Sequence, residues 1–310
     1  MTHTLYFWIG FNLFVALMLL LDLGLLHRNS RVMSMKEAFA WSVFWIGLAG
    51  GFAVFVYFWH GGQSALEFIT GYVVEESMSV DNLFVFLVLF QYFRVPREHQ
   101  YKVLFWGIIG ALVLRLTFIL VGVSILQRFE FVIYFFGALL IYSGYKLFSE
   151  QEREIHPEKN PVLKLFRRRF PVTESYEGDR FFVLRDDRRF ATPLFLVLLV
   201  VETTDVIFAI DSIPAILAIT RDAFIVYTSN VFAILGLRAL YFAISGLMTL
   251  FHYLHYGLAV ILMFVGAKML ASHYFDLPVT ITLGVIAAVL AISIGASLIW
   301  PQKKTAIPAE

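Results

Sequence analysis

Residues 202–214 read ETTDVIFAIDSIP, and this stretch places three carboxylates inside a long apolar segment. Residues 75–82, EESMSVDN, place three more inside a second one. A carboxylate at the centre of a bilayer costs about 2.5–3.5 kcal/mol on insertion scales, so such groups usually face a cavity or a partner. The two stretches therefore predict a membrane protein, and they indicate where in it an ion, a proton or a polar solute is handled.

The composition supports a membrane fold. Of the 310 residues, 60% are hydrophobic and 15% are charged, which is more apolar surface than a soluble core of this size can hide. Apolar runs of about 20 residues recur along the chain, without the strict alternation of a β-barrel. The 33 Phe residues are expected mostly to face lipid or to lie at the membrane interface. Gly107 and Gly110 predict a close helix contact. The chain has no Cys, which excludes disulfides and thiol redox chemistry of its own.

Nine apolar segments are predicted to span the membrane as helices. The first lacks the basic flank and small-residue cleavage site of a secretion signal, so we expect it to remain a span. Most Lys and Arg residues between the segments fall in one set of alternate gaps, and only Arg128 and Arg221 fall in the other. The positive-inside rule then puts the N-terminus outside and the C-terminus in the cytoplasm. The segments are 5–26, 38–59, 68–93, 102–125, 130–148, 192–219, 223–244, 253–272 and 278–300.

Spans three to five and six to eight are predicted to be two copies of one three-helix unit. Each unit carries an Arg followed by a Lys, and the number of residues from Arg115 to Lys146 is nearly the same as that from Arg238 to Lys268. The copies start on opposite sides of the membrane and so form an inverted repeat, a common plan of secondary transporters. The predicted parts are two N-terminal helices in 1–67, the first repeat in 68–148, a charged cytoplasmic loop in 149–191, the inverted second repeat in 192–272, and a last helix with a cytoplasmic tail in 273–310.

The alignment of the acidic spans within this repeat has two solutions. Matching Asp81 with Asp205 keeps the offset of the two arginines. Matching Glu75 with Asp205, and Asp81 with Asp211, keeps a better chemical pattern but requires a shorter loop after the span. We favour the second, because loops tolerate deletion more easily than sites do.

The long connection 149–191 carries ten Lys or Arg and nine Asp or Glu residues, so it is expected to be solvated. Its simplest interpretation is a charged tether between the two halves. Within it, residues 163–170 are consistent with a short helix on the anionic cytoplasmic surface. Residues 180–190 are consistent with a hairpin.

The carboxylates within the spans outnumber the bases there, which are Arg115, Lys146, Arg238 and Lys268. Ion pairing that pins the bundle explains any single acid, because buried charges need partners. It leaves a surplus of acids that must be protonated or neutralised by a mobile cation. Carboxylates with Ser, Thr and Asn side chains suit a hard cation such as Mn²⁺, Mg²⁺ or Ca²⁺. The acids are Asp22, Glu75, Glu76, Asp81, Glu202, Asp205 and Asp211.

Helical periodicity restricts which of these acids can meet. Glu202 and Asp205 are three residues apart and share a face, but Asp205 and Asp211 point about 120° apart on a regular helix. If both hold one ion, either the helix is interrupted or the partner helix wraps around the ion. Pro214 would cause an interruption, because it cannot donate to the Ile210 carbonyl and leaves that oxygen free. A harmless kink is the other interpretation of Pro214.

Three motifs resemble the TerC family of integral membrane proteins, and within it the Alx-type branch: E-x-S-x3-DN-x-FV at 75–85, E-x2-DVIFAIDSIPA at 202–215 and TSN-x-FAILGLR at 228–238. The resemblance implies that members of the family are similar to manganese exporters. It also implies a relationship to transporters built from repeated three-helix units. Some members have been labelled redox modulators. The family is named for tellurium resistance. Glu76 is left out of the site, because an Alx-type relative has a basic residue there. Carried onto this chain, the family's intramembrane acids fall on Asp22, Glu75, Asp81, Glu202, Asp205 and Asp211.

The residues and the resemblance together predict a multi-pass exporter of Mn²⁺ or a similar divalent cation in the cell inner membrane. Its partners are the lipid bilayer, the cation and protons, with no tightly bound cofactor, no nucleic acid and no enzymatic activity. One alternative is a transporter of another substrate, such as an amino acid, another metal or an oxyanion, of which the oxyanion fits the acidic spans poorly. The other is a membrane module that does not transport and docks partners through the 149–191 loop in tellurium, redox or metal stress. The predicted metal ligands are Glu75, Asp81, Asp205, Asp211 and Glu202. The predicted supporting polar or ion-pairing residues are Asp22, Asn82, Ser212, Asn230, Arg115, Arg238, Lys146 and Lys268.

Overall fold

The computed structural model describes residues 2–26, 34–129, 131–149, 160–185, 188–244, 253–275 and 277–299. Within these ranges the chain is helical except for one two-stranded hairpin and the connections. The elements are α1 (Thr2–Leu26), α2 (Met35–His60), α3 (Gly62–Tyr92), α4 (Arg97–Arg128), α5 (Val132–Ser149), α6 (Pro161–Arg169), β1 (Phe182–Arg185), β2 (Arg188–Ala191), α7 (Pro193–Leu217), α8 (Ala223–Ile244), α9 (Leu254–Ala271) and α10 (Val279–Ile299).

Each of the nine predicted spans coincides with a helix. Seven of these helices are long and apolar enough to cross a membrane, namely α2, α4, α5, α7, α8, α9 and α10. In α1 the apolar stretch Leu5–Leu21 is shorter, and the middle of α3 carries Glu75, Glu76 and Asp81. The prediction of an all-helical polytopic membrane protein is therefore confirmed, and the count of nine spans stays a prediction.

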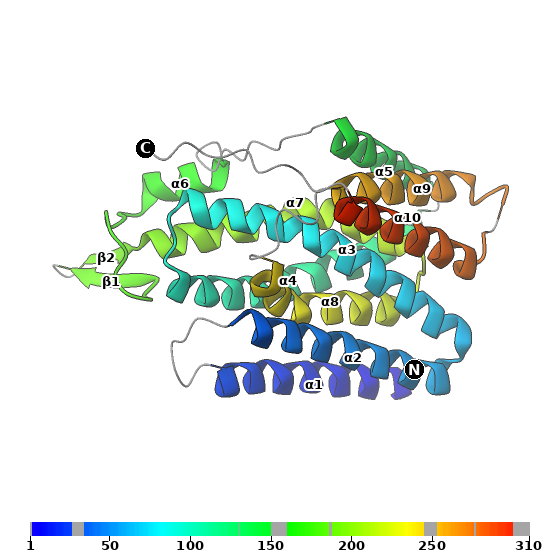
Figure 1. Cartoon of the computed structure of the whole chain (residues 1–310), viewed down its shortest axis with the longest axis horizontal. Helices are drawn as coiled ribbons and strands as arrows, with labels where there is room; N and C mark the ends of the chain where they lie inside the picture. Colours follow the sequence, from blue (N-terminus) through cyan, green and yellow to red (C-terminus); the bar gives the residue numbers. More distant parts are fainter. Residues whose placement is uncertain are drawn as a thin grey trace.

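The long helices lie along the longest axis of the molecule (Figure 1). Helices α1 and α2 form one side, α5, α9 and α10 form the other, and α3, α4, α7 and α8 lie between them. In this central group α3 packs on α8, and α4 packs on α7. Nearly every side chain of α8 is buried, because other helices surround it.

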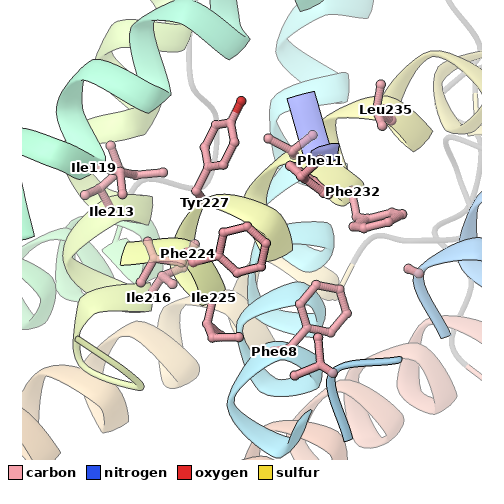
Figure 2. Packing of buried hydrophobic residues seen from close by; sticks show 14 of the residues in the cluster. Phe11, Phe68, Ile119, Ile213, Ile216, Phe224, Ile225, Tyr227, Phe232 and Leu235 are labelled. Carbon is pink, nitrogen blue, oxygen red and sulfur yellow. The ribbon is translucent and has the colours of Figure 1, made fainter. Parts of the chain in front are cut away.

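Aromatic side chains fill the space between α8 and the first three helices (Figure 2). Phe232 of α8 is 1% exposed, and its ring centroid lies 5.8 Å from that of Phe68 and 5.9 Å from that of Phe11. The Phe residues of this cluster face the interior of the bundle, whereas many other Phe residues are exposed on its surface. A helix enclosed on all sides needs large apolar partners, so part of the Phe content serves the interior.

Helices α5 and α9 approach each other through glycines. A Cβ atom on Gly144 would lie 2.7 Å from the Ala259 carbonyl oxygen, and one on Gly266 would lie 2.6 Å from the Gly137 carbonyl oxygen. Small residues allow such close backbone contact between membrane helices.

The segment 160–191 folds at one end of the bundle, which we call the α6 end (Figure 1). It forms α6 and an antiparallel hairpin in which Phe182 pairs with Ala191 and Arg185 with Arg188. A short helix and a hairpin are thus confirmed as secondary structure, and the location of the helix on the membrane surface stays a prediction. The segment is more than a tether, because Leu163 of α6 is only 3% exposed and belongs to the core formed by α3, α4, α7 and α8.

Helix α7 continues without a break across Pro214 to Leu217. The expected interruption is therefore absent from the described structure. Pro214 lies in the last turn, where the backbone still closes with the Ala218 N–H bonded to the Pro214 carbonyl. Because the helix is regular, Asp205 and Asp211 point in different directions.

Candidate functional site

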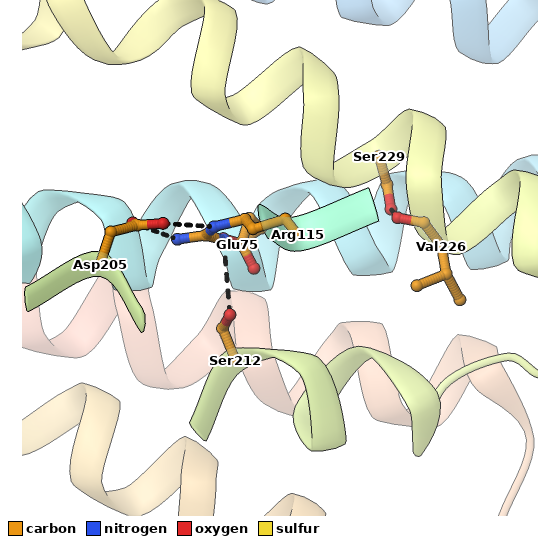
Figure 3. A network of polar contacts seen from close by, with 6 residues as sticks. All are labelled: Glu75, Arg115, Asp205, Ser212, Val226 and Ser229. Atoms are coloured by element: carbon orange, nitrogen blue, oxygen red, sulfur yellow. Dashed lines mark hydrogen bonds and ion pairs between the residues drawn. The ribbon is translucent and has the colours of Figure 1, made fainter. Parts of the chain in front are cut away.

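Arg115 of α4 lies in the interior between two carboxylates from different helices (Figure 3). Its Nη1 forms an ion pair with Glu75 Oε1 of α3, and its Nη2 lies 3.1 Å from Asp205 Oδ1 of α7. Nη1 also donates to Ser212 Oγ at 3.4 Å. Arg115 and Glu75 are 1% and 0% exposed, and Asp205 is 6% exposed. The structure thus brings three predicted site residues together around the guanidinium of a fourth, Arg115.

Glycines on α4 bring α7 close to this group. A Cβ on Gly107 would lie 3.2 Å from Val201 Cγ1. A Cβ on Gly110 would lie 2.1 Å from Glu202 Oε1, so the Glu202 carboxylate occupies the space that a side chain there would take. Sequence reasoning identified the glycine pair only as a packing device. That Gly110 faces Glu202 follows from the packing of α4 on α7, and no local sequence pattern predicts which helices pack together.

Glu202 lies one turn before Asp205 and adds a third carboxylate to the cluster. Among the described residues it has no hydrogen bond or ion pair. Arg115 supplies one positive charge, to Glu75 and Asp205, and the half-buried Glu202 adds a negative charge beside them. Two negative charges are in excess when all three acids are ionised, and excess buried charge requires a counter-ion or protons.

A small cavity adjoins Asp205 between the four central helices. Its volume of about 20 Å³ is enough for about one water molecule. Apart from Asp205 its lining is apolar and includes Ala111, Ile234 and Leu237. On α4 the lining residues precede Arg115, so the cavity lies on the α6 side of the cluster.

Several polar atoms near this level are buried without hydrogen-bond partners among the described residues. They are Glu75 Oε2, Ser79 Oγ and both amide atoms of Asn230. Ser79 is 0% exposed and Asn230 is 1% exposed. Asn82, another predicted supporting residue, is also buried on α3.

The other two predicted carboxylate ligands, Asp211 and Asp81, both have interaction partners. Asp211 accepts a hydrogen bond of 2.5 Å from Ser143 Oγ of α5. Asp81 is half-buried on α3 and has interactions of its own. In the ranges that the structure describes, no three His, Asp or Glu side chains are grouped so as to hold a metal ion. A single site made of all five predicted carboxylates therefore stays a prediction.

The remaining predicted residues are dispersed. Arg238 is buried on α8, where its guanidinium carbon lies 4.4 Å from the Tyr101 ring centroid and its Nη1 donates to the Tyr101 hydroxyl. Lys146 is exposed on α5 and Lys268 is half-buried on α9, and both have interaction partners. Asp22 falls in α1, but its side chain lies outside the described part.

The α6 segment contacts the helix that carries the cluster. Asn160 caps α6 through its side chain, and its Nδ2 donates to Thr203 Oγ1 of α7 at 2.7 Å, beside Glu202. The Tyr176 hydroxyl donates to the Phe93 carbonyl at 2.7 Å. Sequence reasoning missed these contacts, because they join residues far apart in the chain.

A salt bridge on the same segment is exposed. Lys102 Nζ lies 3.1 Å from Asp179 Oδ2. The hydrogen bond from Lys102 holds the pKa of Asp179 below its ordinary value. Because both groups are open to solvent, this pair contributes little to stability.

Comparison with known proteins gives one consistent result. Residues 60–305 match the model of the integral membrane protein TerC family. An uncharacterized membrane protein of Myxococcus xanthus, STKORF319, is 48% identical over 94% of this chain and 92% of its own length. The Escherichia coli K12 protein named as a candidate membrane-bound redox modulator, Alx, is 44% identical over 92% of each chain. No solved structure matches significantly.

Proposed function

The chain belongs to the TerC family of integral membrane proteins, and we propose that it exports divalent metal cations, principally Mn²⁺, across the cell inner membrane in exchange for protons. The metal is the cargo. The observation that carries the proposal is the buried Arg115 guanidinium, shared by Glu75 and Asp205 with the unpaired Glu202 beside it. Every donor in this group is an oxygen, which suits hard cations.

The charge balance of the cluster would allow a divalent cation to exchange for protons. A divalent cation would cancel the two excess negative charges of the three carboxylates and Arg115. When the cation leaves, two protons would restore the same balance, which is the basis for proton coupling. In the empty state Arg115 bridges Glu75 and Asp205, so an entering cation competes with the guanidinium for these oxygens.

Asp81 and Asp211 belong to the same path in this proposal. Each lies six residues beyond an acid of the cluster, on the same helix as that acid. Six residues are about 9 Å along a helix, so we assign them to successive positions of the cation.

We also infer that the units α3–α5 and α7–α9 are inverted repeats within nine spans. The helix contacts support this, since α3 packs on α8 as α7 packs on α4, while α5 packs on α9. The glycine contacts repeat residue by residue: the neighbours of Gly144 are Ala259 and Met263, and those of Gly266 are Gly137 and Ile141. Each of these residues lies 122 positions from its counterpart in the other unit.

The register that pairs Glu75 with Asp205 gains support from the cluster. An axis that relates the two units would make these acids equivalent, and both contact the same guanidinium. If Asp81 were instead the counterpart of Asp205, the repeat would not explain why Glu75 and Asp205 both contact Arg115.

The orientation can be tested directly because the chain has no Cys. Gln63→Cys, at the start of α3, and Ser175→Cys, beside α6, replace exposed residues at opposite ends of the bundle. An impermeant thiol reagent added to intact cells should label Gln63→Cys and leave Ser175→Cys unlabelled. The reverse result would contradict the proposed topology.

Transport is tested in inside-out vesicles that contain the protein, with Mn²⁺, Zn²⁺, Ca²⁺ or Mg²⁺ outside and with or without a pH gradient. We expect Mn²⁺ accumulation that depends on the gradient and is lost in Asp205→Asn and Asp81→Asn. Glu98→Gln, which changes an exposed acid at the start of α4, should transport normally. No accumulation of any of the four metals would reject the proposal.

A second function is a membrane module that docks partners through the α6 segment without transport. The observation in its favour is the folded segment 160–191, in which Arg167, Arg168 and Arg169 are exposed. Changing these three residues to Gln should abolish such docking and leave transport intact. Deletion of the segment is a poorer test, because Leu163 belongs to the core.

A further inference from the structure

The lining of the cavity beside Asp205 extends along the bundle. On α4 it runs from Leu104 to Ala111, and seven residues are about 10 Å along a helix. Ala111 and Asp205 lie at the end next to the cluster. Leu104, Leu237 of α8 and Phe86 of α3 lie toward the α6 end of the bundle, and we call this end of the cavity its mouth. The cavity therefore leads from the cluster toward the α6 end.

A layer of paired side chains lies one turn beyond the mouth. Tyr101 is one turn before Leu104 on α4, and its hydroxyl accepts a hydrogen bond from Arg238 Nη1 of α8. The guanidinium carbon of Arg238 also lies 4.4 Å from the Tyr101 ring centroid. Beside this pair, the Tyr241 hydroxyl of α8 donates to Gln100 Oε1 at 2.9 Å. The two pairs join α4 to α8 across the mouth.

Helix α3 contributes to the same layer through Phe90, one turn beyond the lining of the cavity. The ring centroids of Phe90 and Tyr241 are 5.6 Å apart. Tyr241 and Arg238 are 2% and 3% exposed, whereas Gln100 and Tyr101 are half-buried. The layer therefore separates the cavity from the solvent at the α6 end, with Gln100 and Tyr101 on its solvent side.

This arrangement suits the passage of a cation that binds at the cluster. The wall between Asp205 and the mouth is apolar, so it offers a cation no binding site at which to stop. Arg238 holds a positive charge over the mouth, and a fixed positive charge opposes the entry of a cation while the layer is closed. The cavity itself has room for about one water molecule. A larger species can reach Asp205 from this end only when the layer opens.

We propose that this cavity is the route of the divalent cation between Asp205 and the α6 end, and that the Tyr101–Arg238 and Gln100–Tyr241 pairs are the gate that closes it. This inference rests on the proposed function and adds the route and the gate on one side of the site. Opening requires α4 and α8 to separate at the mouth, which breaks both hydrogen bonds.

The test of the gate is the rate at which a cysteine in the cavity reacts with a membrane-impermeant, positively charged methanethiosulfonate reagent. Inside-out vesicles expose the α6 end in the proposed topology, and the chain has no Cys of its own. Ala111→Cys places a thiol at the cluster end of the cavity. Ile119→Cys, two turns further along α4 and beyond Arg115, is the matched control, because Ile119 is 0% exposed and lies outside the cavity lining.

The gate is loosened by removing one hydroxyl at a time. Tyr101→Phe and Tyr241→Phe should each speed the reaction of Ala111→Cys at least about fivefold, because loss of a hydrogen bond from the closed gate raises the open fraction. Ile119→Cys should stay unreactive in both backgrounds, which separates opening of the gate from general loosening. Tyr142→Phe, on the exposed face of α5, should leave the rate unchanged. An unchanged rate in both Tyr101→Phe and Tyr241→Phe would overturn the gate.

Mn²⁺ uptake by the same vesicles tests the route. Labelling fixes a positive charge in the cavity, so labelled Ala111→Cys should take up Mn²⁺ at least about tenfold more slowly than the same variant before labelling. The reagent should not affect the wild type, which has no thiol. Ile108→Cys, on the same wall, gives a second position.

Undiminished uptake after complete labelling at both positions would overturn the route and leave the proposed function intact. A wild-type protein that takes up no Mn²⁺ would reject the proposed function and the route with it, whatever the labelling rates of the gate variants.

Discussion

Arg115 Nη2 lies 3.1 Å from Asp205 Oδ1 in a part of the bundle where the arginine is only 1% exposed. The same guanidinium contacts Glu75, so a single cation of the protein holds α3, α4 and α7 together. A metal ion bound to these carboxylates has to displace this internal cation. If the cation binds as proposed, the stability of the bundle and the occupancy of the site are therefore coupled.

Removal of the guanidinium should make stability depend on the metal. Arg115→Met leaves Glu75 and Asp205 buried without a counter-charge, a loss that typically costs about 3–5 kcal/mol. Because a bound ligand stabilises the folded state by mass action, saturating Mn²⁺ should raise the melting temperature of Arg115→Met more than that of the wild type. Thermal unfolding in detergent with and without Mn²⁺ measures this.

Arg128→Met, at the exposed end of α4, is the control for the loss of an arginine. It should melt near the wild-type temperature and respond to Mn²⁺ as the wild type does. Equal metal responses in Arg115→Met and the wild type would show that the guanidinium and the metal do not compete.

Gly110→Ala should impair transport by moving Glu202. The new Cβ would lie 2.1 Å from the present position of Glu202 Oε1, so the carboxylate must leave the face that it shares with Asp205. Mn²⁺ uptake into vesicles should fall at least about tenfold with the protein still folded. Gly284→Ala on α10 meets no atom within 4 Å and is the matched control. Normal uptake by Gly110→Ala would remove Glu202 from the site.

Local patterns in the sequence are sufficient to predict the helices and the hairpin. Apolar runs located every long helix, and the residues of α6 and the hairpin were visible as a basic amphipathic run followed by a possible turn. The acidic stretches also located Glu75 and Asp205, since few charged side chains occur at membrane depth without a function. Each of these signals lies within a short stretch of chain.

The arrangement of the site depends on contacts between distant segments. That Arg115 holds both Glu75 and Asp205, while Asp211 contacts Ser143, follows from which helices pack together. Periodicity had already shown that Asp205 and Asp211 diverge on a regular helix. The regular α7 excludes a break at Pro214 and leaves the other two interpretations, a harmless kink and a partner helix that wraps around the ion.

The glycines of the α5–α9 seam give a test of the repeat. Gly144→Ala and Gly266→Ala each push a Cβ to within 3 Å of a backbone carbonyl oxygen on the facing helix. Both should destabilise the protein by about 1–3 kcal/mol, the usual cost of overpacking. Because the two sites have corresponding neighbours, the two losses should be similar. Gly295→Ala meets no atom within 4 Å and should be neutral. Strongly unequal losses in thermal unfolding would argue against the repeat.

Tyr176 should fix the α6 segment at all physiological pH values. Burial raises the pKa of its hydroxyl to about 12, compared with about 10 in an unfolded chain. The contribution of its bond to the Phe93 carbonyl is thus fully present below about pH 10 and is lost as the pH rises toward 12. Tyr176→Phe removes about 1 kcal/mol and should speed hydrogen exchange in 171–192 about fivefold, equally at pH 6 and pH 9.

Tyr142→Phe, which changes an exposed tyrosine on α5, should leave exchange in the segment unchanged. A difference between Tyr176→Phe and the wild type that disappears at pH 9 would mean that the hydroxyl ionises in the folded protein. That result would contradict the raised pKa.

Asp211 provides the sharpest separation between a transport role and a structural one. Ser143 Oγ donates to Asp211 Oδ1, and an Asn at 211 keeps an oxygen that can accept the same bond. Asp211→Asn should therefore fold and insert normally but lose Mn²⁺ uptake, because it removes a charge from the path of the cation. Ser143→Ala deletes the donor and keeps the charge, so it should lower uptake less than Asp211→Asn does. If Asp211→Asn transports at the wild-type rate while Ser143→Ala does not, the acid serves only to join α5 and α7.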